Sequence, residues 1–94
     1  MSPKIEIEKT ADFEFRVRII ERGSESIHYV SMKQDDYTRL TGGKIKPEEL
    51  IKCSFEFLLK RETKESILAR FDLSVIGRYF SDYEREIIRR VSQS

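Results

Sequence analysis

Residues 13–19 alternate strictly between apolar and charged side chains, and this pattern constrains the fold more than any other part of the chain. The apolar side chains are Phe13, Phe15, Val17 and Ile19, and the charged ones are Glu14, Arg16 and Arg18. Successive side chains of a β-strand point to opposite faces, so a period of two predicts a strand with one buried face. The chain therefore needs a sheet whose inner face is covered by other elements.

A second strand is expected from Ser26 to Met32, because the residues before it favour a turn. Gly23 followed by Ser24 suits the two-residue loop of a primed turn, whose first residue has a positive φ angle. This loop fixes the register of the predicted hairpin. The core side would pair Ile19 with His28, Val17 with Val30 and Phe15 with Met32, and the other side would pair Ile20 with Ile27 and Arg18 with Tyr29.

The solvent side of this hairpin has apolar residues where polar ones are expected. Ile20, Ile27 and Tyr29 form the predicted patch, so another element should cover it. Three covers fit the sequence: a helix returning from later in the chain, a second copy of the protein, or the segment from Lys4 to Lys9. That segment also alternates between apolar and charged residues and is a candidate third strand.

The middle of the chain has helical spacing. Ser31 to Gln34 matches a capping box and predicts a short helix from about Met32 to Leu40. Pro47, at a favoured first helical position, opens a longer helix that runs to Arg61. Apolar residues occupy most of the circumference of this longer helix. We therefore expect it to be central, with the sheet on one side and other helices or a partner chain on another.

The last third is also predicted to be helical. A helix starts at Thr63, and the stretch from Phe71 to Ile76 fits the periods of both a strand and a helix. We predict a helix there, with a break near Asp72. Ser81 to Glu84 is a second capping box and opens a final helix. Strands followed by helices indicate an α+β fold: an N-terminal antiparallel β-hairpin, with a candidate third strand, packed against three to four helices.

Size and charge limit the classes of function. A chain of 94 residues is expected to form a single domain over residues 1–94. Its 18 basic and 17 acidic residues leave a net charge of +1, so no general attraction to nucleic acid or an anionic membrane is expected. The sequence has no apolar run near the roughly 20 residues of a membrane span and no apolar leader. We expect a cytoplasmic location without membrane contact.

The chain offers little material for catalysis or metal binding. It has one histidine, His28, expected to be structural at the edge of the core face, and one cysteine, Cys53, expected to be a small buried side chain. The acidic pairs at residues 35–36 and 48–49 lie in first helical turns, where the helix dipole favours negative charge. We therefore predict no catalytic residue, no metal and no cofactor. A small enzyme is the least favoured alternative, and it would require a role for His28 or Cys53.

A DNA-binding alternative arises from the order of elements between Ser26 and Arg61. A strand, a short helix, a glycine turn and a longer helix resemble the ribbon-helix-helix unit, in which strands of two subunits pair. The hairpin partner predicted for this strand and its few base-reading side chains count against the resemblance. The candidate phosphate contacts would be Arg16, Arg18, Lys33, Arg39, Lys44 and Lys46.

Five strings, DFEFRV, LTGGKIKPEELI, SFEFLLKRE, KESIL and FDLSVIGRYF, together resemble a family of short microbial proteins. The likeness covers the chain from about Asp12 to Glu84, with Ser81 standing where that family has a proline. The family has no assigned activity, ligand or catalytic residue. The resemblance therefore implies a natural domain and transfers no function to any position.

Taken together, these patterns predict a non-enzymatic interaction or regulatory module that self-associates, most simply as a homodimer. The candidate interface is the patch of Ile20, Ile27 and Tyr29, supported by the wide apolar arc of the central helix. A different protein partner would fit the same observations.

Overall fold

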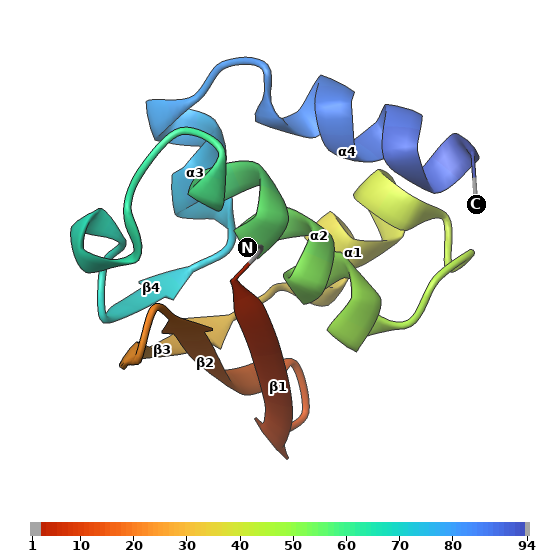
Figure 1. Ribbon diagram of the computed structural model, residues 1–94. Helices are drawn as coiled ribbons and strands as arrows, with labels where there is room; N and C mark the ends of the chain where they lie inside the picture. Colours follow the sequence, from red (N-terminus) through yellow and green to blue (C-terminus); the bar gives the residue numbers. More distant parts are fainter. Residues whose placement is uncertain (1–2, 94) are drawn as a thin grey trace.

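The computed structural model describes residues 3–93 and shows an α+β fold, as predicted (Figure 1). The strands are β1 (Lys4–Ala11), β2 (Glu14–Glu21), β3 (Ser24–Ser31) and β4 (Arg70–Asp72). The helices are α1 (Gln34–Thr41), α2 (Pro47–Leu59), α3 (Ser74–Tyr79) and α4 (Tyr83–Ser92), with a 3₁₀ turn, η1 (Lys64–Ser66), before β4. Within residues 3–93, no helix is long and apolar enough to cross a membrane.

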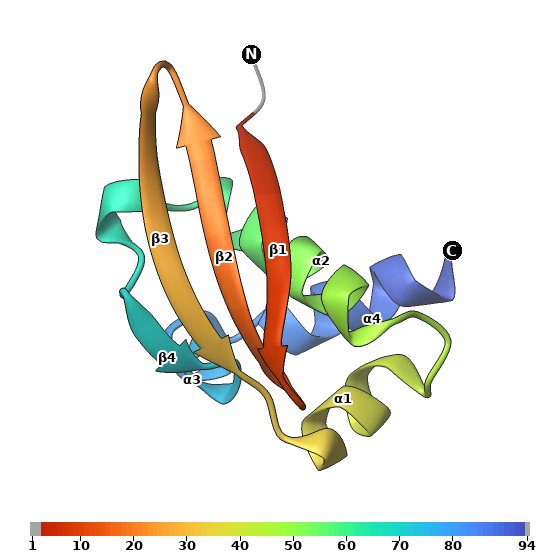
Figure 2. The ribbon, with the colours of Figure 1, turned by 90° about the horizontal axis from the view of Figure 1, so that it is seen from below.

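The four strands form one sheet in the order β1-β2-β3-β4. The first three are antiparallel neighbours, and β4 joins β3 in parallel. The candidate third strand is confirmed, because β1 pairs with β2 and places Ile5 opposite Ile19. This strand extends the sheet and does not cover its outer face. Figure 2 shows that the helices all lie behind the sheet, which leaves the opposite face open.

The register predicted for the β2–β3 hairpin is wrong by two residues. The loop consists of Arg22 and Gly23, whose φ angles are 53° and 79°. Two positive φ angles define a type I′ turn, which strongly favours glycine at its second position. Val17 consequently faces His28, where Val30 was expected. A shift of two residues keeps each side chain on its predicted face but changes every cross-strand pair.

The prediction that α2 is the central helix is confirmed. Figure 1 shows α2 between the sheet and α4. On the sheet side, the Phe55 ring lies 5.6 Å from the His28 ring, and on the other side the Phe57 ring lies 5.3 Å from the Tyr83 ring. The Ser54 hydroxyl and the Tyr83 hydroxyl share a buried hydrogen bond of 2.7 Å. The chain's own sheet and helices thus cover the wide apolar arc of this helix.

Both predicted capping boxes are wrong. Ser31 is the last residue of β3, and its hydroxyl donates to a carboxylate of β4, while Lys33 occupies the N-cap of α1. The short helix accordingly runs from Gln34 to Thr41, later than predicted. Ser81 is likewise not a cap, because α4 begins at Tyr83 with Asp82 at its N-cap.

The helix predicted from Thr63 to the break near Asp72 is wrong, whereas a helix does follow the break, as α3. The chain makes only the short turn η1, then runs extended into β4 and becomes helical again in α3. Asp72 separates strand from helix: its carboxylate accepts a hydrogen bond of 2.9 Å from the Ser31 hydroxyl, and bonds of 3.0 and 2.7 Å from the Ser74 N–H and hydroxyl. Pairing with β3 thus decides the conformation of residues whose own pattern is ambiguous.

Candidate functional site

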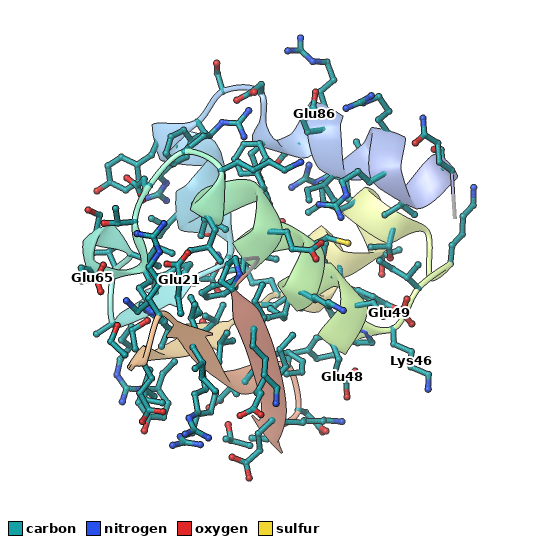
Figure 3. The ribbon with its side chains drawn as sticks, viewed as in Figure 1. Glu21, Lys46, Glu48, Glu49, Glu65 and Glu86 are labelled. Atoms are coloured by element: carbon teal, nitrogen blue, oxygen red, sulfur yellow. The ribbon has the colours of Figure 1, made fainter. Side chains whose placement is uncertain are left out.

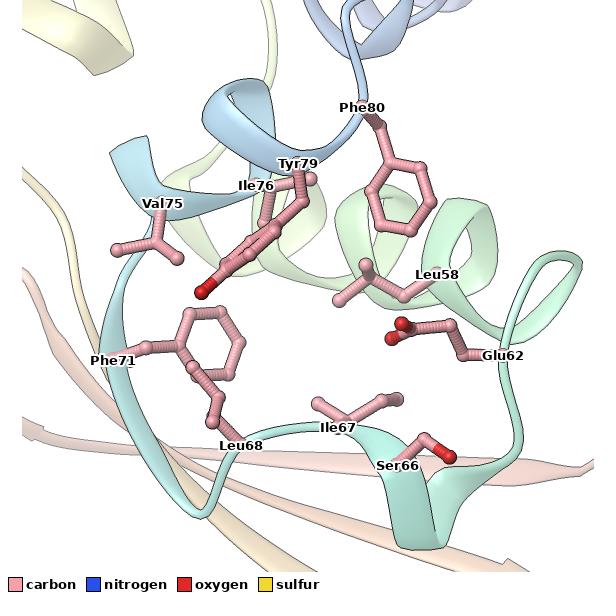
Figure 4. A pocket seen from close by; sticks show the side chains of 10 residues that line it. All are labelled: Leu58, Glu62, Ser66, Ile67, Leu68, Phe71, Val75, Ile76, Tyr79 and Phe80. Atoms are coloured by element: carbon pink, nitrogen blue, oxygen red, sulfur yellow. The ribbon is translucent and has the colours of Figure 1, made fainter.

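A hollow of about 230 Å³ opens between the end of α2, η1, β4 and α3 (Figure 4). We call it the β4–α3 pocket. Its polar side chains are Glu62 and Ser66, which approach from one side. The apolar side chains of its floor and walls are Leu58, Ile67, Phe71, Val75, Ile76 and Phe80.

The chain between α2 and α3 is hydrogen-bonded to β3, which keeps it away from the end of α2 and leaves the pocket between them. The His28 Nδ1–H donates to the Leu68 carbonyl at 2.7 Å, and the Tyr29 N–H donates to the Ala69 carbonyl at 2.8 Å. The Leu73 N–H donates to a β3 carbonyl at 2.8 Å. These bonds fix the backbone on both sides of β4. The side chains of this segment line a cavity as a result.

Two exposed apolar side chains lie at the edge of the pocket. Leu68 is 51% exposed and Tyr79 is 73% exposed, the highest values for large apolar residues in the described part of the chain. Figure 4 shows both beside the hollow. Single exposed apolar residues scattered over a surface are ordinary, whereas exposed apolar residues gathered around an apolar hollow are typical of a binding site.

The size and lining of the pocket indicate what it can bind. Pockets for drug-sized ligands measure about 300 to 1,000 Å³, so this one suits a single apolar side chain or a similarly small group. No histidine or cysteine is among its lining residues. Within residues 3–93, no cluster of histidine, cysteine and carboxylate groups is arranged to hold a metal ion.

His28 and Cys53 have structural surroundings. His28 is 2% exposed; because a carbonyl only accepts, its Nδ1 carries a proton, and its Nε2 shares a hydrogen bond of 2.8 Å with the Ser26 hydroxyl. His28 lies inside the core rather than at its edge. Cys53 is half-buried on α2, and burial raises the pKa of its thiol. A raised pKa leaves less thiolate and makes this cysteine a weak nucleophile.

A second hollow, of about 470 Å³, lies between the start of β1 and the ends of α2 and α4, and many of its lining residues are charged. Arg90 donates to Glu56 there at 2.6 Å, so part of that charge is already paired. The β4–α3 pocket is smaller, but it combines an apolar lining with an exposed apolar rim. It is therefore the stronger candidate site.

The predicted interface residues all lie on the open face of the sheet, but Ile20 and Ile27 are not the direct cross-strand pair that was expected. The register shift separates Ile20 from Ile27, which are both half-buried. Instead, Ile20, Ile27 and Tyr29 stand opposite Glu25, Arg18 and Arg16, respectively. Charged residues of the neighbouring strand thus interrupt the apolar surface that the sequence predicted.

The residues proposed to contact DNA do not gather into one basic face. Arg16 and Arg18 lie on the open face of the sheet and pair with Glu8, Glu6 and Glu25 at 3.5, 3.2 and 2.5 Å. Arg39 of α1 pairs with Glu84 at 2.6 Å and Asp36 at 3.1 Å. Lys33, Lys44 and Lys46 are exposed near the ends of α1 and α2, and Figure 3 shows Lys46 extending into solvent.

The pairing of β3 also bears on the DNA-binding alternative. β3 has β2 on one side and β4 on the other, so the part that β4 covers, Tyr29–Ser31, has no free edge for a strand of a second subunit. The ribbon of a ribbon-helix-helix dimer requires such an edge along the strand. Together with the ion-paired arginines, this pairing removes the main support for that alternative.

None of the residues singled out as candidate contacts lines the β4–α3 pocket. One signal in the sequence pointed toward this region: the stretch from Phe71 to Ile76, which fits the periods of both a strand and a helix. Comparison of the chain with protein-family models, curated proteins and solved structures gave no match. The site is therefore interpreted from its own geometry.

Proposed function

We propose that this chain is a non-enzymatic interaction module that binds a partner protein by enclosing one of the partner's apolar side chains in the β4–α3 pocket. The observation that carries this proposal is the apolar hollow with Leu68 and Tyr79 exposed at its rim. Removing apolar surface from water favours association by roughly 25 cal/mol per Å². A partner's side chain would cover the rim and floor together.

The polar groups at the pocket favour binding over catalysis. The Ser66 hydroxyl lies 3.1 Å from the Thr63 hydroxyl, and no basic side chain is among the lining residues to activate it. Glu62 is the only carboxylate of the lining, so there is no acid–base pair. An interaction role uses the apolar walls directly and needs no such pair.

An NMR titration of the ¹⁵N-labelled chain tests this proposal. N-acetyl-leucinamide and N-acetyl-phenylalaninamide represent a partner's side chain, and N-acetyl-alaninamide is the small control. We expect saturable shifts at residues 66–80 with the two large probes and a Kd in the millimolar range, roughly −4 kcal/mol for so few atoms. The alanine probe should produce no saturable shifts.

Two matched variants locate the binding. Leu68→Ser removes an apolar side chain from the rim, whereas Ile88→Ser removes one from α4 that is 44% exposed and does not line the pocket. Leu68→Ser should weaken probe binding at least threefold, and Ile88→Ser should leave it unchanged. Equal effects of both variants, or shifts scattered over the surface, would show that the pocket is not a binding site.

Self-association through the open face of the sheet is a second candidate. It is supported by the exposure of Tyr29, which is 39% accessible on a face that no helix covers (Figure 2). Light scattering behind a sizing column should then give twice the chain mass of 11.2 kDa at micromolar concentration. Tyr29→Glu should restore the monomer mass. A monomer at all concentrations would leave the pocket as the only proposed interaction surface.

A further inference from the structure

We propose that the partner segment recognised by the β4–α3 pocket carries a lysine or arginine directly beside its apolar side chain, and that Glu62 binds this cation. The inference rests on the proposed function, because it concerns what accompanies the side chain in the pocket. It follows from the position of one carboxylate and from the pairing of the cations around it.

Glu62 is held at the pocket by the end of α2. Its backbone N–H donates to the Leu58 carbonyl at 2.8 Å, which continues the last helical turn and fixes the start of its side chain. Figure 4 shows the carboxylate pointing into the hollow, beside Leu58 and opposite the rim residues. The side chain is half-buried. A ligand that fills the pocket would therefore contact this carboxylate.

This carboxylate is electrostatically unsatisfied in the free protein. It lies just beyond the C-terminus of α2, where the helix dipole disfavours negative charge. Within residues 3–93, no lysine or arginine lies within ion-pair distance of the Glu62 carboxylate, and no hydrogen bond reaches it. A cationic ligand group would relieve both the dipole repulsion and the missing pair.

Two neighbouring cations, Arg61 and Lys64, are engaged elsewhere, whereas Lys60 and Arg90 line the second hollow, which Glu62 also borders. Arg61 donates to Asp82 at 2.6 Å, and its guanidinium carbon lies 3.7 Å from the centre of the Phe57 ring. Lys64 is 5% exposed and pairs with Glu65 of the same turn. Neither is among the residues that line the pocket. The β4–α3 pocket thus has a negative charge at one wall and no basic residue in its lining.

This combination selects one kind of occupant. A purely apolar side chain would bury Glu62 without a partner, which costs free energy, and an acidic segment would add repulsion. A lysine or arginine next to the apolar residue of a peptide places its cation within reach of the carboxylate while the apolar group fills the cavity. The expected partner is therefore a protein segment with adjacent apolar and basic residues.

Three neutral-capped dipeptides test the inference by the same NMR titration. N-acetyl-Leu-Lys-amide, N-acetyl-Leu-Gln-amide and N-acetyl-Leu-Glu-amide share the leucine and differ in charge. We expect the lysine probe to bind about threefold to tenfold more tightly than the glutamine probe, as for a partly shielded ion pair, and the glutamate probe to bind most weakly. The preference should shrink when salt is raised from about 0.05 to 0.5 M.

Glu62→Gln should abolish the preference for the lysine probe over the glutamine probe. Glu49→Gln is the matched control, because it changes the net charge equally but lies at the opposite end of α2, where Glu49 is exposed. It should retain the preference. If no dipeptide binds at the pocket, the proposed function fails. If all three bind equally, or if Glu62→Gln keeps the preference, only the charge inference fails.

Discussion

The sheet with α2 and the segment from η1 to α3 contain similar apolar residues but use them differently. Val17 and Ile19 of β2 and Phe55 of α2 are each 0% exposed, whereas Leu68 and Tyr79 are 51% and 73% exposed. The first region consists of regular strands and a regular helix, whose apolar faces are buried against one another. The second is a short strand between two short turns of helix, and it leaves apolar surface in water. Surface of that kind is what an interaction module needs.

The two regions also differ in how they are held. β2 is paired along both edges, with β1 on one side and β3 on the other. The segment from η1 to α3 depends on a three-residue strand and a few bonds to β3, among them the His28 bond to the Leu68 carbonyl. Segments with fewer long-range bonds unfold locally more easily and are common at binding sites. Mutations in the two regions should therefore have different effects.

Phe55→Ala should have the largest effect on stability. Its ring is completely buried between the sheet and α2, so truncation removes apolar contacts and leaves a cavity, a loss of about 3 to 5 kcal/mol in the free energy of unfolding. Phe80→Ala is the matched change at the pocket, where the ring is only half-buried, and should cost clearly less. Urea unfolding measures both. Equal losses would contradict the distinction between the two regions.

The sequence was a good guide to the first region for a physical reason. The alternation in residues 13–19 and the apolar circumference of α2 each require burial on a definite face, and the observed faces agree. The prediction of the hairpin register was wrong because it depended on which residues adopt positive φ angles at the turn. Arg22 does so beside Gly23, although arginine is not expected to adopt that conformation.

The second region could not be predicted in the same way. Phe71 to Ile76 satisfies two periods at once, and the choice was made by pairing with β3, about forty residues earlier in the chain. The sequence favoured a helix there, but the chain is extended before and within β4, and Leu68 and Phe71 line a cavity. The candidate site was missed because it depends on this long-range pairing. Conflict between local pattern and fold is common at functional sites.

Asp72→Ala should have an intermediate effect, and one that depends on pH. Burial acts to raise the pKa of Asp72, but hydrogen bonds from Ser74 and Ser31 outweigh it and hold the pKa below its ordinary value. Because the pKa of this carboxyl group is lower in the native state than in the unfolded state, where it is near 4, its ionised form stabilises the fold at pH values above about 4. This stabilisation is lost as the pH falls through the native pKa. The variant should lose about 1 to 2 kcal/mol at pH 7.

The difference in unfolding free energy between the wild type and Asp72→Ala should shrink as the pH is lowered from 7 to about 3. Asp12→Ala is the control, because the Asp12 side chain is 95% exposed, and its effect should stay near zero at each pH. Denaturant unfolding at several pH values gives both curves. A difference for Asp72→Ala that is constant with pH would mean that the carboxylate charge does not stabilise the junction of β4 and α3.

Leu68→Ser should have the smallest effect on stability while having a large effect on binding. Because half of the side chain is already in water, its loss should change the free energy of unfolding by no more than about 0.5 kcal/mol. The His28 bond to the Leu68 carbonyl involves only the backbone of residue 68, so the substitution leaves it in place. Thermal or urea unfolding of this variant beside the NMR titration separates the two effects. A loss above about 1 kcal/mol would place Leu68 in the structural core, and the weaker probe binding would then reflect a disturbed fold, not a lost contact.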